Sequence, residues 1–582
     1  MTERLTIPEL LAAAAAARPD AIALLAPARQ PLTYKSLART IAEGASSLAA
    51  FGIARGDAIA IALDPGSDAA TAFLAAASAA IACPLNPQYV AAEFEFHLGA
   101  LKARALILEE GREGAAAEAA RKLGISIIRL TPLPEAGAFV LAGPKSAKKK
   151  KIAQAKTDDV ALILHTSGTT ARPKKVPLTH ANLLASARAV AETLALSSSD
   201  RGLCVMPLFH IHGLVAALLA PLWAGCSVVV PPGFHAIEFF DWCKEFAPNW
   251  YTAVPSMHQA LLARADQFRD VVANMHFRFI RSSSAALPPT VLAELERVFR
   301  CPVLESYGMT EAAHQMASNP LPPRPRKPGT VGVPAGPEIA ILDEQGEILA
   351  AGKSGEVAIR GPSVTAGYLE NEAANAAAFT RGWFRTGDLG VIDADGYLTL
   401  VSRIKEIINR GGEKVAPREV EEALLAHPDV VEAAVFPVRD TALGEEVGAA
   451  VVLKPNAKAN AAALKEFAGS RLAYFKLPRY LVVVDEIPKG ATGKIQRAGL
   501  AERLGLKENR AAGSADQTPP RNETESLLCR LWCEVLRVDS VGIHSRFLDL
   551  GGDSVLAAQL VARLRRSSRD LRGLPGHWRC SR

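Results

Sequence analysis

Residues 164–175 have the sequence Leu164-His165-Thr166-Ser167-Gly168-Thr169-Thr170-Ala171-Arg172-Pro173-Lys174-Lys175. This hydroxyl-rich loop follows the apolar run Val160 to Leu164, which has the composition of a buried strand. Glycine and hydroxyl residues offer backbone N–H groups and side-chain donors to phosphate oxygens, and Lys174 adds a positive charge. The alternative is an ordinary Ser/Thr turn. Hydroxyl residues, Gly, Pro and Lys together after a strand favour a nucleoside triphosphate site. Its residues would be Thr166, Ser167, Gly168, Thr169, Thr170 and Lys174.

This loop is not of the Walker type. Ile495 follows Gly493-Lys494, where a Walker loop has Ser or Thr. Phosphate binding is therefore expected from the loop after Leu164.

Composition limits the classes of protein that remain. The chain has 582 residues, and at about 150 residues per domain it can bury several cores. Charged residues make up 22% and hydrophobic residues 49%, which is too apolar for a disordered chain. The net charge of +6 is too small for the dense basic surface that nucleic-acid binding needs, so nucleic acid is not an expected partner.

Neither export nor membrane insertion is expected. The eight cysteines lack C-x-x-C spacing, which argues against a zinc site or a disulfide framework and favours a reducing compartment. The apolar stretch Leu10 to Ala17 is preceded by Glu3 and Glu9, so it predicts an amphipathic helix and not a signal peptide. No apolar run approaches the ~20 residues of a transmembrane helix. With no Ser-Lys-Leu ending, the sequence predicts a cytoplasmic protein.

The pattern along the chain predicts an α/β fold with layered sheets and helices over residues 1–402. Residues 403–506 predict a smaller, mobile α+β domain, and residues 507–522, with Gly513 and Pro519, predict a linker. Helices are expected at Thr524 to Leu536 and Val555 to Leu564, in an all-α segment over residues 523–582. The lysines between 145 and 151 predict a solvated loop.

Five motifs in order resemble the adenylate-forming superfamily of acyl-CoA synthetases, luciferases and peptide-synthetase adenylation domains. The resemblance covers about residues 1–506. The motifs are the loop above, Ser306-Tyr307-Gly308-Met309-Thr310-Glu311, Trp383-Phe384-Arg385-Thr386-Gly387-Asp388, Arg403-Ile404-Lys405-Glu406 and Pro488-Lys489-Gly490-Ala491-Thr492-Gly493-Lys494.

The resemblance implies a role for individual residues of these motifs. Glu311, beside Thr310, would hold Mg²⁺ against the phosphates, and Lys494 would contact the attacking carboxylate and the α-phosphate. Surface acids and exposed lysines are the alternatives. The nucleoside would be bound by Ser306, Tyr307 stacking on adenine, Asp388 on the ribose hydroxyls, Arg403, Ala285 and Ala286.

One residue departs from the family pattern. Members usually have glycine after the Pro-Lys pair, where this chain has Lys175. If the backbone there needs a positive φ, Lys175 would strain the loop and alter its closure.

The implied reaction has two steps. A carboxylate and ATP, with Mg²⁺, give an acyl-adenylate and pyrophosphate. The small domain then rotates about a hinge near Lys405, and the thiol of CoA displaces AMP.

The acid is predicted from the residues that line the acyl pocket in this family. Here they include His210, His212, Ser284 and His314, whereas a fatty-acid pocket would be apolar. Imidazoles and hydroxyls suit a short polar acid, and the motifs most resemble the oxalate-CoA ligase branch, in which His210, Ser284 and His314 would hold oxalate. The alternative is that the histidines gate the pocket or satisfy core hydrogen bonds. A His210/His212 metal site is not expected, because no third ligand is evident.

The C-terminal segment resembles a carrier protein. Leu550-Gly551-Gly552-Asp553-Ser554 matches a phosphopantetheine attachment site, which implies 4'-phosphopantetheine on Ser554 and a phosphopantetheinyl transferase as partner. The tail after Leu564 lacks helical apolar spacing, so we expect a truncated carrier, and an unmodified Ser554 is the alternative.

Three functions remain open. The first is a ligase that joins a small polar acid, most of all oxalate, to CoA. The second is a loading module that transfers its acyl or aminoacyl group to the arm on Ser554. The third is an inactive, carrier-tethered binding protein, which Glu311, Asp388, Arg403 and Lys494 argue against.

Overall fold

The structure is a computed structural model. It describes residues 5–144, 153–166, 173–440, 443–489, 495, 497, 499–506, 518–536, 538, 540–545, 547, 556, 559–561 and 563–564. The chain divides into two compact units, Met1–Phe436 with Val447–Ala498, and Pro437–Glu446 with Gly499–Arg582. The finer division at 402, 506 and 522 stays a prediction. The lysine-rich stretch 145–151 lies outside the described residues.

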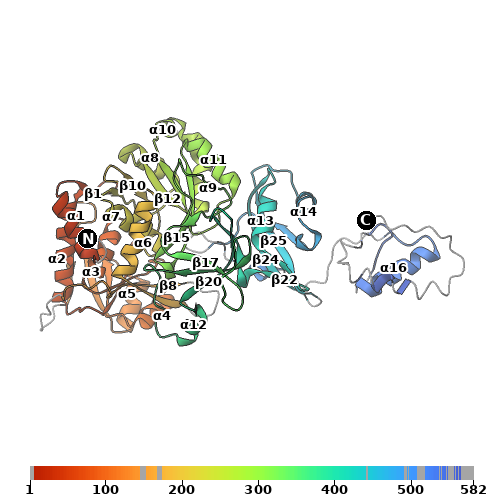
Figure 1. The fold of residues 1–582 in the computed structure, drawn as a ribbon, viewed down its shortest axis with the longest axis horizontal. Helices are drawn as coiled ribbons and strands as arrows, with labels where there is room; N and C mark the ends of the chain where they lie inside the picture. Colours follow the sequence, from red (N-terminus) through yellow and green to blue (C-terminus); the bar gives the residue numbers. More distant parts are fainter. Residues whose placement is uncertain are drawn as a thin grey trace. The chain divides into compact units, whose positions relative to one another are not determined.

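The first unit is built around a large sheet, which is parallel at its centre (Figure 1). Its strands, in spatial order, are β16 (Val333–Pro334), β15 (His314–Ser318), β14 (Val303–Met309), β13 (Phe279–Ser282), β12 (Trp250–Ala253), β10 (Arg201–Cys204), β11 (Ser227–Val229), β1 (Ile22–Leu25) and β2 (Leu32–Thr33).

Three further sheets complete the described part of the chain. The second has the order β7 (Phe139–Ala142), β6 (Ser126–Pro132), β5 (Ala105–Glu109), β3 (Ala58–Ile61), β4 (Ile81–Pro84), β8 (Val160–Thr166) and β9 (Lys174–Thr179). The third has β17 (Glu338–Leu342), β18 (Ser354–Arg360), β20 (Trp383–Ile392) and β19 (Phe379–Thr380), with β21 (Leu398–Arg403) on β20. The fourth has β23 (Glu413–Val415), β22 (Ile408–Arg410), β25 (Gly444–Leu453) and β24 (Val430–Asp440), with β26 (Tyr480–Val483) on β25.

Helices connect these strands. They are α1 (Ile7–Ala17), α2 (Tyr34–Ala50), α3 (Ser67–Ala79), α4 (Ala91–Leu101), α5 (Ala115–Lys122), α6 (His180–Thr193), a π-helix (His212–Leu219), α7 (Ala220–Trp223), α8 (Glu238–Phe246), α9 (Pro255–Ala265), α10 (Arg269–Ala273), α11 (Pro289–Phe299), α12 (Glu372–Ala378), α13 (Pro417–Leu425), α14 (Ala461–Gly469), α15 (Leu500–Arg503) and α16 (Glu523–Leu536). The predicted α/β class, the helix at Leu10 to Ala17 and the strand at Val160 to Leu164 are confirmed.

Both faces of the large sheet are buried, which explains its continuous apolar runs. Along β12, Trp250 packs into one apolar cluster, whereas its neighbour Tyr251 packs into another. The first cluster includes α6 and the π-helix, and the second includes α8, α9 and α11. Because successive side chains of a strand point to opposite faces, helices on both faces favour apolar residues at most strand positions.

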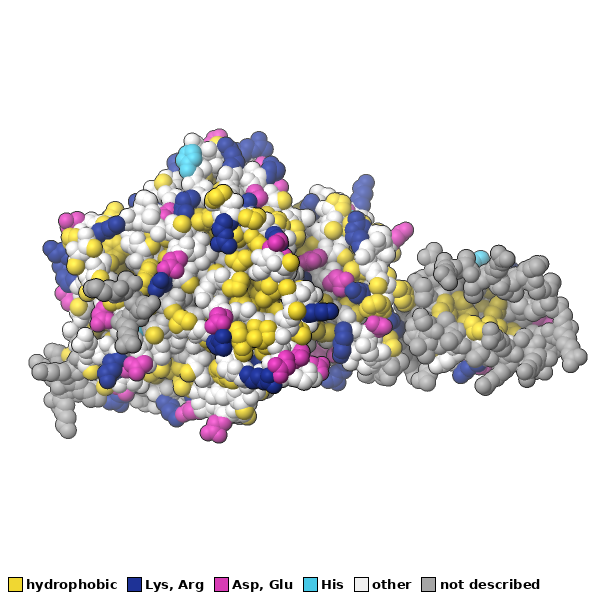
Figure 2. Space-filling model, in the orientation of Figure 1, with side chains coloured by type: hydrophobic (Ala, Val, Ile, Leu, Met, Phe, Trp, Pro, Cys, Tyr) yellow, Lys and Arg dark blue, Asp and Glu magenta, His cyan; other side chains and the backbone are white. Residues whose placement is uncertain are grey.

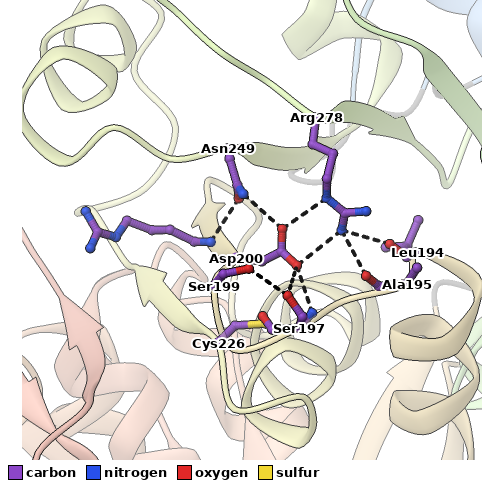
Figure 3. Close-up of polar contacts among 9 residues, drawn as sticks. Leu194, Ala195, Ser197, Ser199, Asp200, Cys226, Asn249 and Arg278 are labelled. Atoms are coloured by element: carbon purple, nitrogen blue, oxygen red, sulfur yellow. Dashed lines mark hydrogen bonds and ion pairs between the residues drawn. The ribbon is translucent and has the colours of Figure 1, made fainter.

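A polar network ties together the amino ends of three neighbouring parallel strands (Figure 3). Asp200, Asn249 and Arg278 directly precede β10, β12 and β13. The Asp200 carboxylate accepts hydrogen bonds from Arg278 Nε at 3.0 Å, Asn249 Nδ2 at 2.9 Å and the Ser197 backbone N–H at 2.7 Å. Arg278 also donates to the Leu194 carbonyl at the end of α6. The network fixes the strand ends opposite to those that carry the predicted site.

Asp200→Asn is expected to lower the free energy of unfolding by about 3 kcal/mol, because it removes the counter-ion of Arg278 from a site where Asp200 is 3% exposed. The urea unfolding midpoint measures this loss. Asp241→Asn, on the exposed surface of α8, is the control. Equal midpoints for the two variants would contradict the role assigned to Asp200.

In the second unit, described residues form a small apolar cluster. Leu531 and Val535 of α16 are buried with Leu560, and Trp532 meets Phe547 edge-on with ring centroids 5.0 Å apart. The predicted helix Thr524 to Leu536 is confirmed by α16. The second predicted helix falls mostly outside the described residues, as does the tail 565–582.

Surface charges of both signs are interspersed on the face drawn in Figure 2. Charged side chains of the described residues also pair, such as Lys122 with Glu95 at 2.7 Å. No helix within the described residues combines the length and the apolarity that crossing a membrane requires.

Candidate active site

The two ends of the phosphate loop are held side by side. Thr166 ends β8 and Lys174 begins β9, and these residues are partners in the antiparallel register. The tip, Ser167, Gly168, Thr169 and Thr170, lies outside the described residues.

Lys175 does not strain the loop. It lies in β9 opposite His165, and its φ is not positive. Its ammonium group donates to the Ala100 carbonyl at 2.9 Å and pairs with Glu370. The conditional expectation of strain at Lys175 is therefore wrong: this lysine anchors β9 to α4 and to the segment before α12.

The side chain of Tyr368 lies between Glu311 and Lys174 and contacts both. The Glu311 carboxylate is 6% exposed and accepts a hydrogen bond from the Tyr368 hydroxyl at 2.9 Å. The Lys174 ammonium lies 4.3 Å from the centre of the Tyr368 ring. Thr310 begins the same short 3₁₀ turn, and its carbonyl accepts from the Ala313 N–H. The predicted metal ligand and the loop lysine thus converge.

Glu311 fits the predicted magnesium role. Mg²⁺ at nucleotide sites typically takes one or two carboxylates and completes its coordination with phosphate oxygens and water. The described residues contain no group of three potential ligands that could hold a metal without the nucleotide. One buried carboxylate beside a phosphate loop is the donor set that such an ion needs.

Tyr307, Asp388 and Arg403 meet at the predicted nucleoside position. Asp388 and Arg403 are direct register partners on β20 and β21, and Arg403 Nε lies 3.1 Å from Asp388 Oδ1. The Tyr307 hydroxyl donates to Asp388 Oδ2. Burial raises the pKa of Tyr307, and the Asp388 carboxylate raises the pKa of Arg403. Tyr307 and Arg403 thus orient the Asp388 carboxylate, a charged hydrogen-bond acceptor, near the end of β14.

The loop with Ala285 and Ala286 is fastened to β14. Both alanines are exposed, whereas the Leu287 N–H donates to Glu305 Oε1 at 3.0 Å. Ser283 Oγ donates to the carbonyl of Ser306, and Ser306 Oγ donates to the Ser282 carbonyl. These bonds hold the two predicted nucleotide-binding segments edge to edge.

Glu305 is a buried acid with an altered pKa. Burial raises its pKa to about 7, opposed by the Leu287 N–H and by Arg418, and reinforced by Glu422. Its ordinary value is 4.5, so the folded state binds more protons than the unfolded state between these values. Stability should therefore fall as pH rises from about 4.5 to about 7, by roughly 3 kcal/mol at 1.4 kcal/mol per unit.

Glu305→Gln is expected to abolish that fall, because the amide stays neutral and still accepts from Leu287. Urea midpoints at pH 5 and pH 8 would measure the difference, with Glu344→Gln in an exposed turn as control. A wild-type decline that persists in Glu305→Gln would rule out Glu305 as its source.

A second cluster, which we call the acyl-site cluster, contains His212, Thr252, Arg281, Ser284, His314 and Gln315. The His212 and His314 rings stack with centroids 4.7 Å apart and 16° between their planes. His212 Nδ1 lies 3.0 Å from Ser284 Oγ, and His212 Nε2 lies 2.7 Å from Thr252 Oγ1. His212 begins the π-helix, a rare element that often marks functional positions.

Two residues of this cluster have strained backbones. Ser284 has a φ of 73°, and His314 has a φ of 102°. Such values cost of order 1–3 kcal/mol for residues other than glycine and tend to occur at functional sites. Gly308 explains part of the geometry, because a Cβ there would lie 1.8 Å from the His314 carbonyl oxygen. Glycine is therefore required for His314 to reach its position.

The structure brings Ser284 and His314 together, as predicted, but through His212. His210 lies before the π-helix, half-buried, with its ring 4.6 Å from that of Phe209; its substrate role stays a prediction. Sequence reasoning missed Thr252, Arg281 and Gln315. The signal for Arg281 was a cation inside the run Phe279-Ile280-Arg281-Ser282, where a buried strand should be apolar.

Two further predicted residues lie outside the described part of the chain. Lys494 is one, although Lys489 and Ile495 form an antiparallel bridge at the base of its loop. Lys489 Nζ lies 2.5 Å from Glu432 Oε1, which fixes that base to β24. Ser554 is the other, and its modification stays a prediction.

Family models match most of the chain. The model described as AMP-binding enzyme matches residues 11–369, and the AMP-binding enzyme C-terminal domain matches residues 419–494. A phosphopantetheine attachment site model matches residues 526–567.

Individual proteins are similar over nearly their whole length. An oxalate–CoA ligase of Arabidopsis thaliana is 44% identical over 86% of this chain and 98% of its own. An oxalate–CoA ligase of Saccharomyces cerevisiae is 43% identical over 77% of this chain and 87% of its own. The crystal structure of ATP-bound MatB from Rhodopseudomonas palustris superposes with a TM-score of 0.77 at 29% identity, covering 86% of this chain and 99% of that one.

Proposed function

The chain belongs to the AMP-binding enzyme family, and from this premise we propose that it activates a small polar carboxylic acid, first of all oxalate, and transfers the acyl group to CoA. The membership confirms the resemblance carried by its five motifs. The observation that carries the choice of acid is the stacked pair of His212 and His314 beside Ser284.

In the first step, an oxygen of the acid forms a bond to the α-phosphorus of ATP, and the bond to pyrophosphate breaks. Asp388, oriented by Tyr307 and Arg403, accepts the ribose hydroxyls and sets the position of the α-phosphate. Glu311 would hold Mg²⁺, which neutralises phosphate charge when bound. Lys174 adds a positive charge on the same side. In the second step the thiol sulfur of CoA bonds to the acyl carbon, and AMP and a proton leave.

The acyl-site cluster suits an acid whose far end is polar. One carboxylate of oxalate attacks phosphorus, so the other must be held by hydrogen-bond donors. Ser284 and His314 offer hydroxyl and imidazole groups there, while His212 bonds to Ser284 and Thr252 and orients Ser284. The two histidines are 2% and 1% exposed. An alkyl chain could not accept hydrogen bonds from this cluster, whereas a second carboxylate could.

The proposal is tested by AMP release from the purified full chain with ATP. Oxalate, malonate, octanoate and an amino-acid panel are compared with and without CoA, at constant free Mg²⁺ because oxalate chelates it. Release that depends on both oxalate and CoA is expected. Turnover with octanoate or an amino acid, and none with oxalate, would contradict the proposed substrate.

His314→Ala is expected to raise the KM for oxalate at least 10-fold, while the KM for ATP changes less than 2-fold, because the lost imidazole faces the acid and not the nucleotide. Steady-state kinetics measure both constants. His235→Ala, at an exposed position before α8, is the control. An unchanged oxalate KM would remove His314 from the acid site.

The match to a phosphopantetheine attachment site favours a second candidate acceptor, the arm on Ser554. After treatment with a phosphopantetheinyl transferase and CoA, intact mass would reveal the modified chain. Transfer of radiolabelled acyl groups to the chain after removal of free CoA would then identify a loading module. Ser554→Ala is the control, and absence of labelling on the modified wild type would exclude this acceptor.

A further inference from the structure

Arg281 is a fully buried cation that no described carboxylate balances. It lies in β13, is 0% exposed, and forms no ion pair with any residue of the described part of the chain. It donates to Thr252 Oγ1 at 3.2 Å, to Gln315 Oε1 at 3.1 Å and, more weakly, to His212 Nε2 at 3.4 Å. Burial lowers its pKa to about 9, so it stays charged at neutral pH. A buried charge without a partner costs several kcal/mol.

The contacts of Arg281 set the direction of a hydrogen-bond chain. A guanidinium group only donates, so Thr252 Oγ1 must accept from it. The Thr252 hydroxyl proton then faces His212 Nε2, 2.7 Å away. With Nε2 accepting, neutral His212 carries its proton on Nδ1 and donates to Ser284 Oγ at 3.0 Å. Ser284 Oγ therefore accepts from His212. No described residue accepts the proton of Ser284, which can bond to an acceptor on a bound acid.

Strand register keeps this chain rigid. Thr252 and Arg281 are direct partners on the parallel strands β12 and β13, so their side chains leave the sheet on the same face. Gln315 holds the other side of the guanidinium and is itself fixed by donating to the Ala335 carbonyl at 2.9 Å and to Thr193 Oγ1 at 3.1 Å. At the far end of the hydrogen-bond chain, the backbone of Ser284 has a φ of 73°, a value at which glycine would be unstrained.

We infer that Arg281 is a positioning residue that makes Ser284 a hydrogen-bond donor to the acid and supplies a buried positive charge, so that acids with a second anionic group are preferred. The inference rests on the proposed function for its substrate. Its hydrogen-bond part concerns the ligand-free protein and can be tested separately. A dianionic acid keeps one negative charge after adenylation, and the buried guanidinium of Arg281 is a positive charge at the start of the hydrogen-bond chain that reaches Ser284.

The first test measures the tautomer of His212 without any substrate. Long-range ¹H–¹⁵N spectra of the ¹⁵N-histidine-labelled protein, assigned with His212→Gln, should show the Nδ1–H tautomer. Arg281→Met and, if that variant does not fold, Thr252→Val should shift the population toward Nε2–H. A His212 signal that is the same in the wild type and in the folded variants would overturn the directed chain.

The second test measures selectivity. Arg281→Met should raise the KM for oxalate 10-fold to 100-fold while the KM for ATP stays within 2-fold, and should reduce the preference for oxalate over glyoxylate. Arg278→Met, three residues earlier and in the Asp200 network, is the matched control for lost stability. Ser284→Gly, which fits the positive φ, should give a similar loss, and the double variant should lose less than the product of the two.

The outcomes separate the two claims. If the wild type turns over no dianionic acid, the proposed function fails together with the substrate part of the inference, whereas the tautomer result still decides the hydrogen-bond part. If the wild type uses oxalate and Arg281→Met changes neither its KM nor its preference over glyoxylate, the assignment of Arg281 is overturned.

Discussion

Glu311→Gln is expected to lower the rate of adenylate formation about 10²-fold to 10³-fold, the size seen when one electrostatic stabiliser of a transition state is removed. The amide has the shape of the carboxylate and can still accept from the Tyr368 hydroxyl, so the buried hydrogen bond at 2.9 Å persists. What disappears is the negative charge that would hold the ion against the phosphates. In free energy the loss is about 3–4 kcal/mol at 1.36 kcal/mol per tenfold change.

Pyrophosphate release at saturating ATP, followed as a function of Mg²⁺ concentration, measures the effect. The Mg²⁺ needed for half-maximal rate should rise in Glu311→Gln. Glu305→Gln is the matched control, because it makes the same change at a buried glutamate of β14 that faces Leu287 and not the phosphate loop. Equal losses in the two variants would mean that burial of charge, and not contact with the ion, explains the effect.

The sequence predicted the parts of this molecule that depend on local pattern. Apolar runs such as Val160 to Leu164 became β8, because a sheet covered on both faces needs apolar residues throughout. Asp388 and Arg403 were assigned to one nucleoside site, and the structure makes them register partners across β20 and β21. Asp388 and Arg403 are fifteen residues apart, and this spacing alone does not predict that they pair. The family motifs predicted the shared site.

The rest depends on contacts between distant segments. Lys175 stands where family members usually have glycine, yet it is extended in β9, whereas Ser284 has the positive φ. Thr252 and Arg281 come together only because β12 and β13 are neighbours in register. His212 joins them because its π-helix packs against the same cluster. No local pattern encodes which strands are adjacent, so these polar contacts could not be derived from the sequence.

Lys494→Ala is expected to suppress adenylation by about 10²-fold to 10³-fold and to change thioester formation from supplied acyl-adenylate much less. The ammonium group contacts the attacking carboxylate and the α-phosphate in the first step by the resemblance, and charge develops there only while the phosphorus is attacked. In the second step the adenylate already exists, and the thiol attacks an acyl carbon. The two half-reactions should therefore separate.

The described residues at the base of this loop indicate that the loss of adenylation would come from the missing ammonium group and not from movement of the loop. Lys489 pairs with Ile495 and with Glu432, so the loop base remains fixed when the side chain at 494 is shortened. Pyrophosphate release measures the first half-reaction, and acyl-CoA formation from synthetic acyl-adenylate measures the second. Lys458→Ala, at an exposed position of the region after β25, is the control. Because a general loss of folding would slow both half-reactions equally, equal losses in Lys494→Ala would refute the division of labour assigned to this lysine.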